Sequence, residues 1–243
     1  MAKPVVLFLH GFLESSHIWQ EIIPHVEQHV EVHTMDLPGH GDAPVLAEVH
    51  TMVLMADVVF YYCTKHKLQH ITLIGHSMGG YVGLAFVEKY PQLLDHLILL
   101  NSTTKADSLT RKQNRDRGIR QVAKHKDVFI SMAISNLFLP ENHKKFKETI
   151  TQLKQRAKKF PSEGIIAALQ GMKVRPDRTD ILTNFTGKKT FIAGKDDPLI
   201  PVQESRQIAK ETGTKYYELP GGHMSYLEDT AQLRGILVEL FKE

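Results

Sequence analysis

Short apolar runs alternate with longer segments of helical periodicity along most of this chain. The apolar runs occupy residues 4–10, 30–35, 71–74, 97–100, 189–193 and 215–219. The segments with helical spacing of apolar residues lie at 16–29, 51–67, 80–90, 202–212 and 230–242. Regular alternation of this kind predicts a doubly wound α/β fold, with a mostly parallel sheet of six strands and right-handed crossovers.

The alternation stops between residues 103 and 180. No strand pattern occurs there, and helices are predicted over residues 109–124, 127–137, 141–158 and 162–172. An all-helical insertion over the carboxyl edge of a sheet is a natural lid. We therefore predict an α/β core formed by residues 1–104 and 181–243, and an all-helical lid formed by residues 105–180.

Charge sets the same segment apart. Residues 105–180 hold 18 lysines and arginines against 8 aspartates and glutamates, a net charge of +10, whereas the whole chain carries +3. Solvated helix faces explain this excess most simply, and attraction of an anionic substrate is the sharper alternative. Nucleic acid is not expected as a partner, because the basic residues are not interleaved with aromatic ones and match no known module.

The rest of the composition is that of an ordinary globular protein. A length of 243 residues suits one main domain. Cys63 is the only cysteine, so no intramolecular disulfide can form. Residues 1–9 contain no signal-peptide pattern, and no apolar run reaches 18 residues. A cytoplasmic protein without membrane contact is expected, while the pattern leaves the oligomeric state open.

The first candidate for chemistry is the run Gly75-His-Ser-Met-Gly79, which joins an apolar strand to a helix. A serine forced into a tight strand-to-helix turn needs glycine two residues before and two residues after it, because those positions approach neighbouring backbone. The turn exposes the hydroxyl of Ser77 near a helix N-terminus. The backbone N–H of Met78 then becomes a candidate donor to an oxyanion.

Three more loops follow predicted strands at the same edge of the sheet. Gly11 after the first strand lets backbone approach a ligand, which makes the Phe12 N–H a second candidate oxyanion donor. The loop after residue 193 offers Asp196 and Asp197, and the loop after residue 219 offers His223. A serine nucleophile needs a histidine base and an orienting carboxylate, and the order serine, aspartate, histidine is that of a nucleophile-elbow hydrolase.

The chain resembles the α/β-hydrolase superfamily over nearly its whole length. The resemblance rests on His-Gly-Phe (10–12), Gly-His-Ser-Met-Gly (75–79), Gly-Lys-Asp-Asp (194–197) and Gly-Gly-His (221–223). It implies that Ser77 is the nucleophile, Asp197 the orienting acid and His223 the base. It also implies that the N–H groups of Phe12 and Met78 form the oxyanion hole. The usual first antiparallel hairpin of the family is absent, which leaves six strands.

Several nearby residues are weaker candidates. The resemblance favours Asp197 over the adjacent Asp196, and Asp107 is a more remote choice. His76 precedes the serine, but adjacent side chains at a sharp turn point apart, so packing within the loop is expected. His25 and His29 have helical spacing without the order of known zinc motifs. Neither a metal nor another cofactor is predicted.

These features predict a serine hydrolase that cleaves small or medium acyl esters through an acyl-enzyme. Its partner would be a small-molecule acyl substrate, and Phe129, Met132 and Phe138 are expected to roof the acyl pocket. A lyase that uses the same serine and histidine for proton abstraction is one alternative. The chain resembles the menaquinone-pathway synthase of this fold in its short N-terminus and in two runs, His-Gly-Phe-Leu and Asp-Leu-Pro-Gly-His-Gly. A ligand receptor built on the hydrolase fold is the other alternative.

Overall fold

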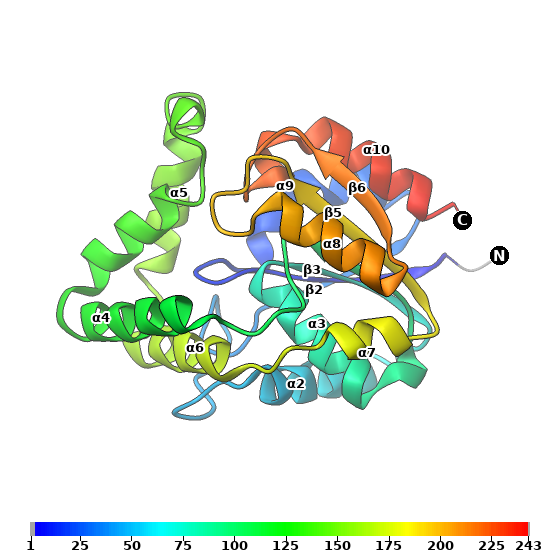
Figure 1. Ribbon diagram of the computed structural model, residues 1–243, viewed down its shortest axis with the longest axis horizontal. Coiled ribbons are helices and arrows are strands. Elements are labelled where there is room, and N and C mark those ends of the chain that lie inside the picture. Colours follow the sequence, from blue (N-terminus) through cyan, green and yellow to red (C-terminus); the bar gives the residue numbers. More distant parts are fainter. Residues whose placement is uncertain (1–2, 243) are drawn as a thin grey trace.

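Six parallel strands form one sheet in the computed structural model, which describes residues 3–242 (Figure 1). The strands are β1 (Val5–Leu9), β2 (Glu31–Met35), β3 (Ile71–His76), β4 (Leu94–Leu100), β5 (Lys188–Gly194) and β6 (Lys215–Leu219). They lie in the order β2-β1-β3-β4-β5-β6, and each neighbouring pair is parallel. The predicted doubly wound α/β fold is confirmed, and the sheet is parallel throughout.

Helices cover both faces of the sheet. They include η1 (Ser16–Glu21), α1 (Ile23–Val26), α2 (Met52–Lys65), α3 (Met78–Lys89), η2 (Pro91–Leu93), α8 (Val202–Thr212), α9 (Ser225–Glu228) and α10 (Thr230–Leu240). The segment 16–29, whose spacing predicted a helix, is instead the short pair η1 and α1. Pro24 lies in the first turn of α1, where its missing N–H is tolerated, so a new helix begins there.

Burial along the strands follows the sheet order. Strands β1, β3 and β4 are covered on both faces, and apolar side chains such as Leu7, Leu73 and Leu97 are fully buried in them. The edge strands β2 and β6 are only partly buried. A strand covered on both faces needs a near-continuous apolar sequence, and the runs at 71–74 and 97–100 have one.

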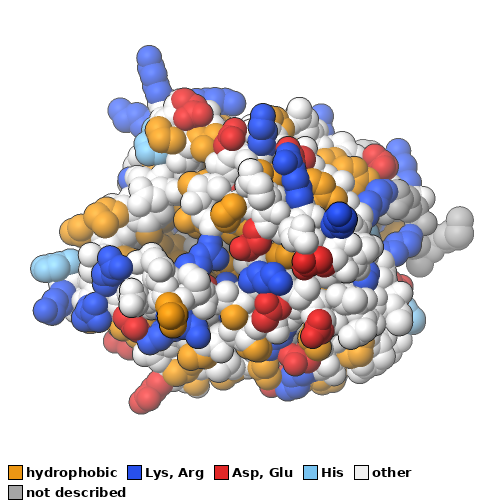
Figure 2. Space-filling view, viewed as in Figure 1, with side chains coloured by type: hydrophobic (Ala, Val, Ile, Leu, Met, Phe, Trp, Pro, Cys, Tyr) orange, Lys and Arg blue, Asp and Glu red, His pale blue; other side chains and the backbone are white. Residues whose placement is uncertain are grey.

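The inserted segment between β4 and β5 is helical, as expected. It contains α4 (Leu109–Ser135), η3 (Pro140–Asn142), α5 (Lys147–Ala157), α6 (Ser162–Val174) and the start of α7 (Thr179–Asn184). Helix α4 packs against both α5 and α6 beyond the carboxyl ends of the strands, at the left of Figure 1. Figure 2 shows Lys and Arg side chains gathered over this end of the molecule.

The boundaries within the insertion agree with the prediction in part. The two helices expected over 109–124 and 127–137 are confirmed: together they form α4, and non-helical backbone at His125 (φ −146°, ψ 56°) separates them. The helix expected from residue 141 begins only at Lys147, after η3. Helix α7 was not predicted, and it packs against α3 and α8. The proposed limit of the lid at residue 180 therefore falls inside a helix that packs with the core.

The topology determines where a ligand can approach. Strand β1 has β2 on one side and β3 on the other, so the chain leaves β1 in one direction and returns to its opposite side. In open parallel sheets such a reversal opens a crevice at the carboxyl ends of the two strands. The loops after β1 and β3, which begin at His10 and Ser77, meet at this crevice.

The close packing of the turn after β3 leaves no room for a side chain at Gly75. A Cβ at this position would lie 2.4 Å from the Gly79 backbone and 2.5 Å from the Gly80 nitrogen, and backbone cannot move aside cheaply. We expect Gly75→Ala to lower the free energy of unfolding by about 2 to 3 kcal/mol, measured by denaturant titration. In the control Gly235→Ala the new Cβ meets nothing within 4 Å on α10, so equal stability losses in the two variants would contradict this packing.

Candidate active site

The turn at Ser77 holds a backbone conformation that few side chains adopt. Ser77 has φ 49° and ψ −113°, which is strained for a residue other than glycine. Its N–H donates to the Leu100 carbonyl at 2.9 Å, and its carbonyl accepts a hydrogen bond from the Ser102 hydroxyl at 2.9 Å. At Gly79 a Cβ would lie 2.5 Å from the Leu9 carbonyl oxygen. The surrounding backbone thus forces the turn and leaves the serine hydroxyl at its apex.

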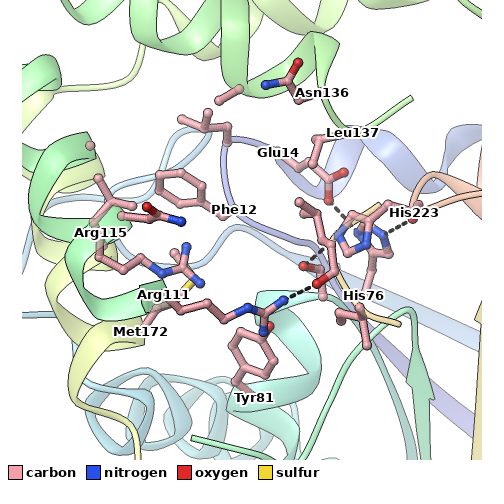
Figure 3. Close-up of a pocket in the computed structure, with 18 of the residues that line it drawn as sticks. Phe12, Glu14, His76, Tyr81, Arg111, Arg115, Asn136, Leu137, Met172 and His223 are labelled. Atoms are coloured by element: carbon pink, nitrogen blue, oxygen red, sulfur yellow. Dashed lines mark hydrogen bonds and ion pairs between the residues drawn. The ribbon is translucent and has the colours of Figure 1, made fainter. Parts of the chain in front are cut away.

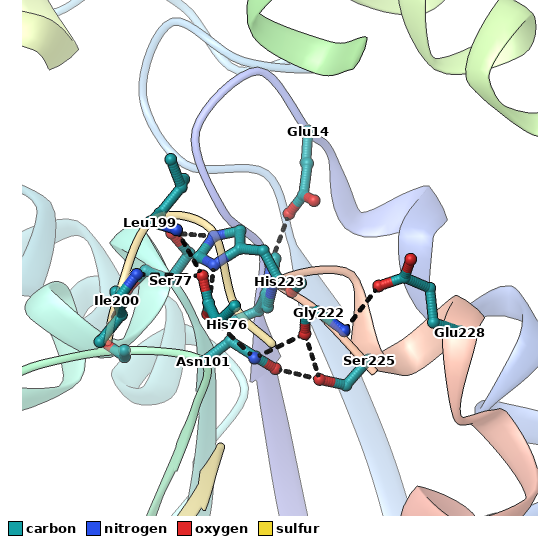
Figure 4. Close-up of polar contacts among 12 residues, drawn as sticks. Glu14, His76, Ser77, Asn101, Leu199, Ile200, Gly222, His223, Ser225 and Glu228 are labelled. Atoms are coloured by element: carbon teal, nitrogen blue, oxygen red, sulfur yellow. Dashed lines mark hydrogen bonds and ion pairs between the residues drawn. The ribbon is translucent and has the colours of Figure 1, made fainter. Parts of the chain in front are cut away.

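The structure brings Ser77, His223 and Asp197 together from loops that follow three different strands. The Nε2 atom of His223 lies 2.9 Å from the Ser77 hydroxyl, and Nδ1 lies 2.8 Å from Oδ2 of Asp197. Figure 4 shows His223 next to Ser77. Because a carboxylate can only accept, Nδ1 carries the proton and Nε2 is the acceptor that faces the hydroxyl.

Asp197 is held as an ionised group. Its Oδ1 accepts hydrogen bonds from the N–H groups of Leu199 at 2.8 Å and Ile200 at 3.0 Å. Burial by itself would raise the pKa of this carboxyl. Attraction to the imidazolium form of His223, the hydrogen bond from its ring and the two backbone donors outweigh burial and hold the pKa of Asp197 below its ordinary value. The imidazole therefore faces a negative charge.

The other two candidate acids lie elsewhere. Asp196 is exposed on the same loop. Asp107 pairs with Arg175 at 2.7 Å and with Arg115 at 3.1 Å, both of which belong to the inserted segment or its end. Of the three carboxylates considered from the sequence, Asp197 is the one whose hydrogen bond reaches the imidazole.

A cavity of about 290 Å³ opens over the serine, between the inserted helices and the core (Figure 3). Ser77 and His223 lie in its wall. Its apolar lining includes Phe12, Phe129, Leu137, Leu169 and Met172.

Met78 is one of the two residues whose N–H groups are expected to bind an oxyanion. It is the first residue of α3, and the first N–H groups of a helix have no partner within the helix.

The three residues expected to roof the pocket take different positions. Phe129 lines the cavity, together with Ala133 one turn along α4. Met132 is 50% exposed and borders a separate surface hollow. Phe138 is buried, with its ring 5.8 Å from that of Phe146. The prediction that Met132 and Phe138 line the pocket is therefore wrong, because α4 and the chain after it turn these side chains away from the cavity.

Comparison with known proteins identifies the family of this chain. A sequence model described as the alpha/beta hydrolase fold matches residues 4–230. The chain belongs to the alpha/beta hydrolase fold family.

The proteins that this chain is similar to carry names that describe different activities. A putative carbamate hydrolase, RutD of Yersinia enterocolitica, is 26% identical over 98% of this chain and 86% of its own length. A thermophilic esterase from Thermogutta terrifontis, solved with malate bound, is 30% identical, with a TM-score of 0.93 over 99% of this chain and 90% of its own. MenH from S. aureus is 23% identical, with a TM-score of 0.85 over 100% and 94%, a likeness of fold alone.

Asn101 supports the histidine loop of this hydrolase-fold protein, and the sequence analysis gave it no role. It follows β4 with φ 46°, a conformation that asparagine tolerates better than most residues. Its Nδ2 donates to Asp197 at 3.1 Å and to the Gly222 carbonyl at 3.0 Å, while its Oδ1 accepts from the Ser225 hydroxyl. Its position directly after a central strand was the one feature of the sequence that could have indicated this role.

A second buried pair, Glu14 and His76, braces the loops from the other side. His76 Nδ1 lies 2.9 Å from Glu14 Oε2, and His76 Nε2 lies 3.0 Å from the His223 carbonyl oxygen. Glu14 also accepts hydrogen bonds from the Gly11 N–H at 2.6 Å and from the Tyr226 hydroxyl at 3.0 Å. His76 was expected only to pack within its loop. In the structure it connects the loops after β1, β3 and β6.

His76 carries a positive charge in this arrangement. Both of its ring nitrogens face acceptors, so both must be protonated. Burial would lower the pKa of His76, but the charge and hydrogen bond of Glu14 raise it above the ordinary value. Burial would likewise raise the pKa of Glu14, and His76 reverses that shift. The pair is therefore a buried ion pair.

No group of three or more His, Cys, Asp or Glu side chains in residues 3–242 is arranged to hold a metal ion. No helix within the same range is long and apolar enough to cross a membrane.

The buried ion pair predicts a stability loss that depends on pH. We expect Glu14→Gln to lower the free energy of unfolding by about 3 kcal/mol near neutral pH, because it leaves His76 buried without its partner. The contribution from His76 is full below its ordinary pKa of 6.5 and is lost as the pH rises through its raised pKa.

The Tm difference between wild type and Glu14→Gln should therefore narrow as the pH rises from about 6 to about 10. Calorimetry across this range measures the difference, with the exposed Glu21→Gln as the matched control. A difference that is small, or that matches the control at every pH, would show that the pair does not act as an ion pair.

Proposed function

We propose that this protein is a serine hydrolase that cleaves small or medium acyl esters. The observation that carries the proposal is the continuous hydrogen-bonded chain from Ser77 through His223 to Asp197, which opens into the cavity. The likeness to the Thermogutta terrifontis esterase over almost the full length supports ester chemistry. A volume of about 290 Å³ lies at the small end of ligand pockets, which favours small or medium acyl groups.

The proposed reaction begins with proton transfer to the imidazole. His223 Nε2 accepts the proton of Ser77 while the serine oxygen attacks the acyl carbon, and Asp197 stabilises the imidazolium. The ester C–O bond then breaks, and His223 returns the proton to the departing alcohol. A water molecule, deprotonated by the same nitrogen, attacks the acyl-enzyme, which releases the acid and restores the serine.

The oxyanion formed in each step needs two donors, for which we propose the N–H groups of Phe12 and Met78. The N–H of Met78 lies at the N-terminus of α3, where the helix dipole favours negative charge. Phe12 follows Gly11, whose N–H is fixed by the Glu14 carboxylate. A donor loop held rigidly before reaction does not have to reorganise as the charge develops.

The two alternatives raised by the sequence, a lyase and a ligand receptor, require different features of the site. A lyase would use the same serine and histidine for proton abstraction and would accumulate no acyl-enzyme. Arginine side chains in the cavity wall would suit the polycarboxylate substrate of such an enzyme. A ligand receptor would not need the complete hydrogen-bonded chain, so the geometry supports an enzyme over a receptor.

Labelling of Ser77 tests the hydrolase directly. We expect a fluorophosphonate probe to add one adduct to the wild type by intact mass and none to Ser77→Ala. Hydrolysis of p-nitrophenyl acetate and butyrate should fall by at least about 10⁴-fold in Ser77→Ala, because the nucleophile and its partners act as a unit. An acyl-enzyme trapped by acid quench would exclude the lyase, and hydrolysis that survives in Ser77→Ala would contradict the proposal.

The neighbouring aspartates provide a matched pair of variants. Asp197→Asn should lower kcat by about 10⁴-fold, because the amide stabilises neither the imidazolium nor the required tautomer. Asp196→Asn makes the same chemical change on the exposed side of the loop and should leave kcat unchanged. Comparable losses in both variants, with both proteins folded by circular dichroism, would show that the orienting acid is assigned wrongly.

A further inference from the structure

We infer that Arg111 and Arg115 form a carboxylate-binding subsite in the cavity, which selects acyl substrates that carry a second, negatively charged carboxylate. The inference rests on the proposed function and names its substrate class: monoesters of short dicarboxylic acids. The acyl carbon would lie at Ser77 and the free carboxylate at the arginines.

Both arginines belong to the same face of one helix. They stand four residues apart on α4, a spacing that places side chains next to each other, and both line the cavity that Ser77 and His223 also line. Figure 3 shows both guanidinium groups pointing from α4 into the cavity, toward the side on which His223 lies. An anion between them would lie within the substrate space.

Arg115 is one of two arginines that pair with the carboxylate of Asp107. Asp107 is buried and pairs through Oδ1 with Arg175 at 2.7 Å, and Arg175 is itself only 2% exposed. Arg115 reaches Oδ2 of the same carboxylate at 3.1 Å through Nε, with its side chain 21% exposed. One negative charge thus faces two positive charges. Because Arg175 already neutralises Asp107, the charge of Arg115 is in excess.

Arg111 adds a second uncompensated charge. Its terminal nitrogen donates to the backbone carbonyl of Leu199, a neutral acceptor two residues after Asp197. Glu14 is the only acidic side chain among the described residues that line the cavity, and it is already paired with His76. The cavity wall therefore presents two guanidinium groups to a ligand, with no cavity-lining carboxylate to neutralise them.

Buried contacts behind the cavity wall hold the guanidinium group of Arg115 in place. The guanidinium carbon of Arg175 lies 4.0 Å from the centroid of the Tyr81 ring, and Tyr81 itself lines the cavity. Arg175 and Asp107 therefore form a buried base behind the wall, and Arg115 extends from this base into the cavity. Planar guanidinium groups recognise carboxylates with paired hydrogen bonds.

Two esters of the same shape test the subsite. Mono-p-nitrophenyl glutarate carries a carboxylate where p-nitrophenyl 5-methylhexanoate carries an isopropyl group. We expect the wild type to show the higher kcat/KM for the glutarate ester. In Arg111→Gln and in Arg115→Gln, the ratio of the two kcat/KM values should fall by about 10-fold each, mainly through KM, and by up to about 100-fold in the double variant.

Arg117→Gln is the matched control, because Arg117 lies on the same helix, is exposed and does not line the cavity. It removes the same charge and should leave the ratio unchanged. A wild type that prefers the neutral ester, or arginine variants whose ratio equals that of the control, would overturn the subsite. In that outcome the hydrolase itself stands as long as cleavage of the neutral ester still depends on Ser77.

A binding experiment separates the subsite from the chemistry. Titration of Ser77→Ala with monomethyl glutarate, followed by calorimetry, needs no turnover. We expect binding at least about 10-fold tighter than in Ser77→Ala combined with Arg111→Gln and Arg115→Gln. Equal binding in the two proteins, or no binding in either, would overturn the subsite even if esters are cleaved. Tighter binding without cleavage of either ester would support the subsite and reject the proposed hydrolase.

Discussion

The packing of the turn at Ser77 against its neighbours is the constraint on which the rest of the site depends. A backbone conformation of this kind costs about 1 to 3 kcal/mol and persists only where the surroundings leave no alternative. Here the ends of β1 and β4 enforce it: Gly79 lies against the Leu9 carbonyl, and the Leu100 carbonyl holds the serine N–H. The burial of the central strands fixes those ends, so the core that stabilises the fold also shapes the candidate site.

Two buried carboxylates give two neighbouring histidines opposite properties. Asp197 faces Nδ1 of His223, whose Nε2 is left beside a hydroxyl that can donate. Glu14 faces Nδ1 of His76, whose Nε2 meets a backbone carbonyl that can only accept. The first imidazole is thus ready to take up a proton, whereas the second already holds two and serves as a fixed cation. The difference between the two rings arises from the group that faces Nε2, because both rings are buried and both have a carboxylate partner.

Sequence patterns predicted those parts of the molecule that depend on near neighbours. The six strands, the glycines around Ser77 and the three post-strand loops each have a local signature, and parallel strands necessarily bring such loops to one edge. Glu14 and Asn101 have no such signature, because their partners lie 62 and 96 positions away. The positions of Met132 and Phe138 depend on how α4 and the chain after it are rotated against the core, which apolar character alone does not determine.

The net charge of +10 in residues 105–180 is another feature of the sequence that does not by itself predict where a ligand binds. Many of these basic side chains are exposed to water, where salt screens their charge within about 10 Å. Arg111 and Arg115 differ because they line the cavity, where charges are screened less than in open water. Arg117, which is exposed, contributes equally to the sum but does not line the cavity. What a basic segment can bind therefore depends on the few side chains that enter the cavity and on the acids that they meet there.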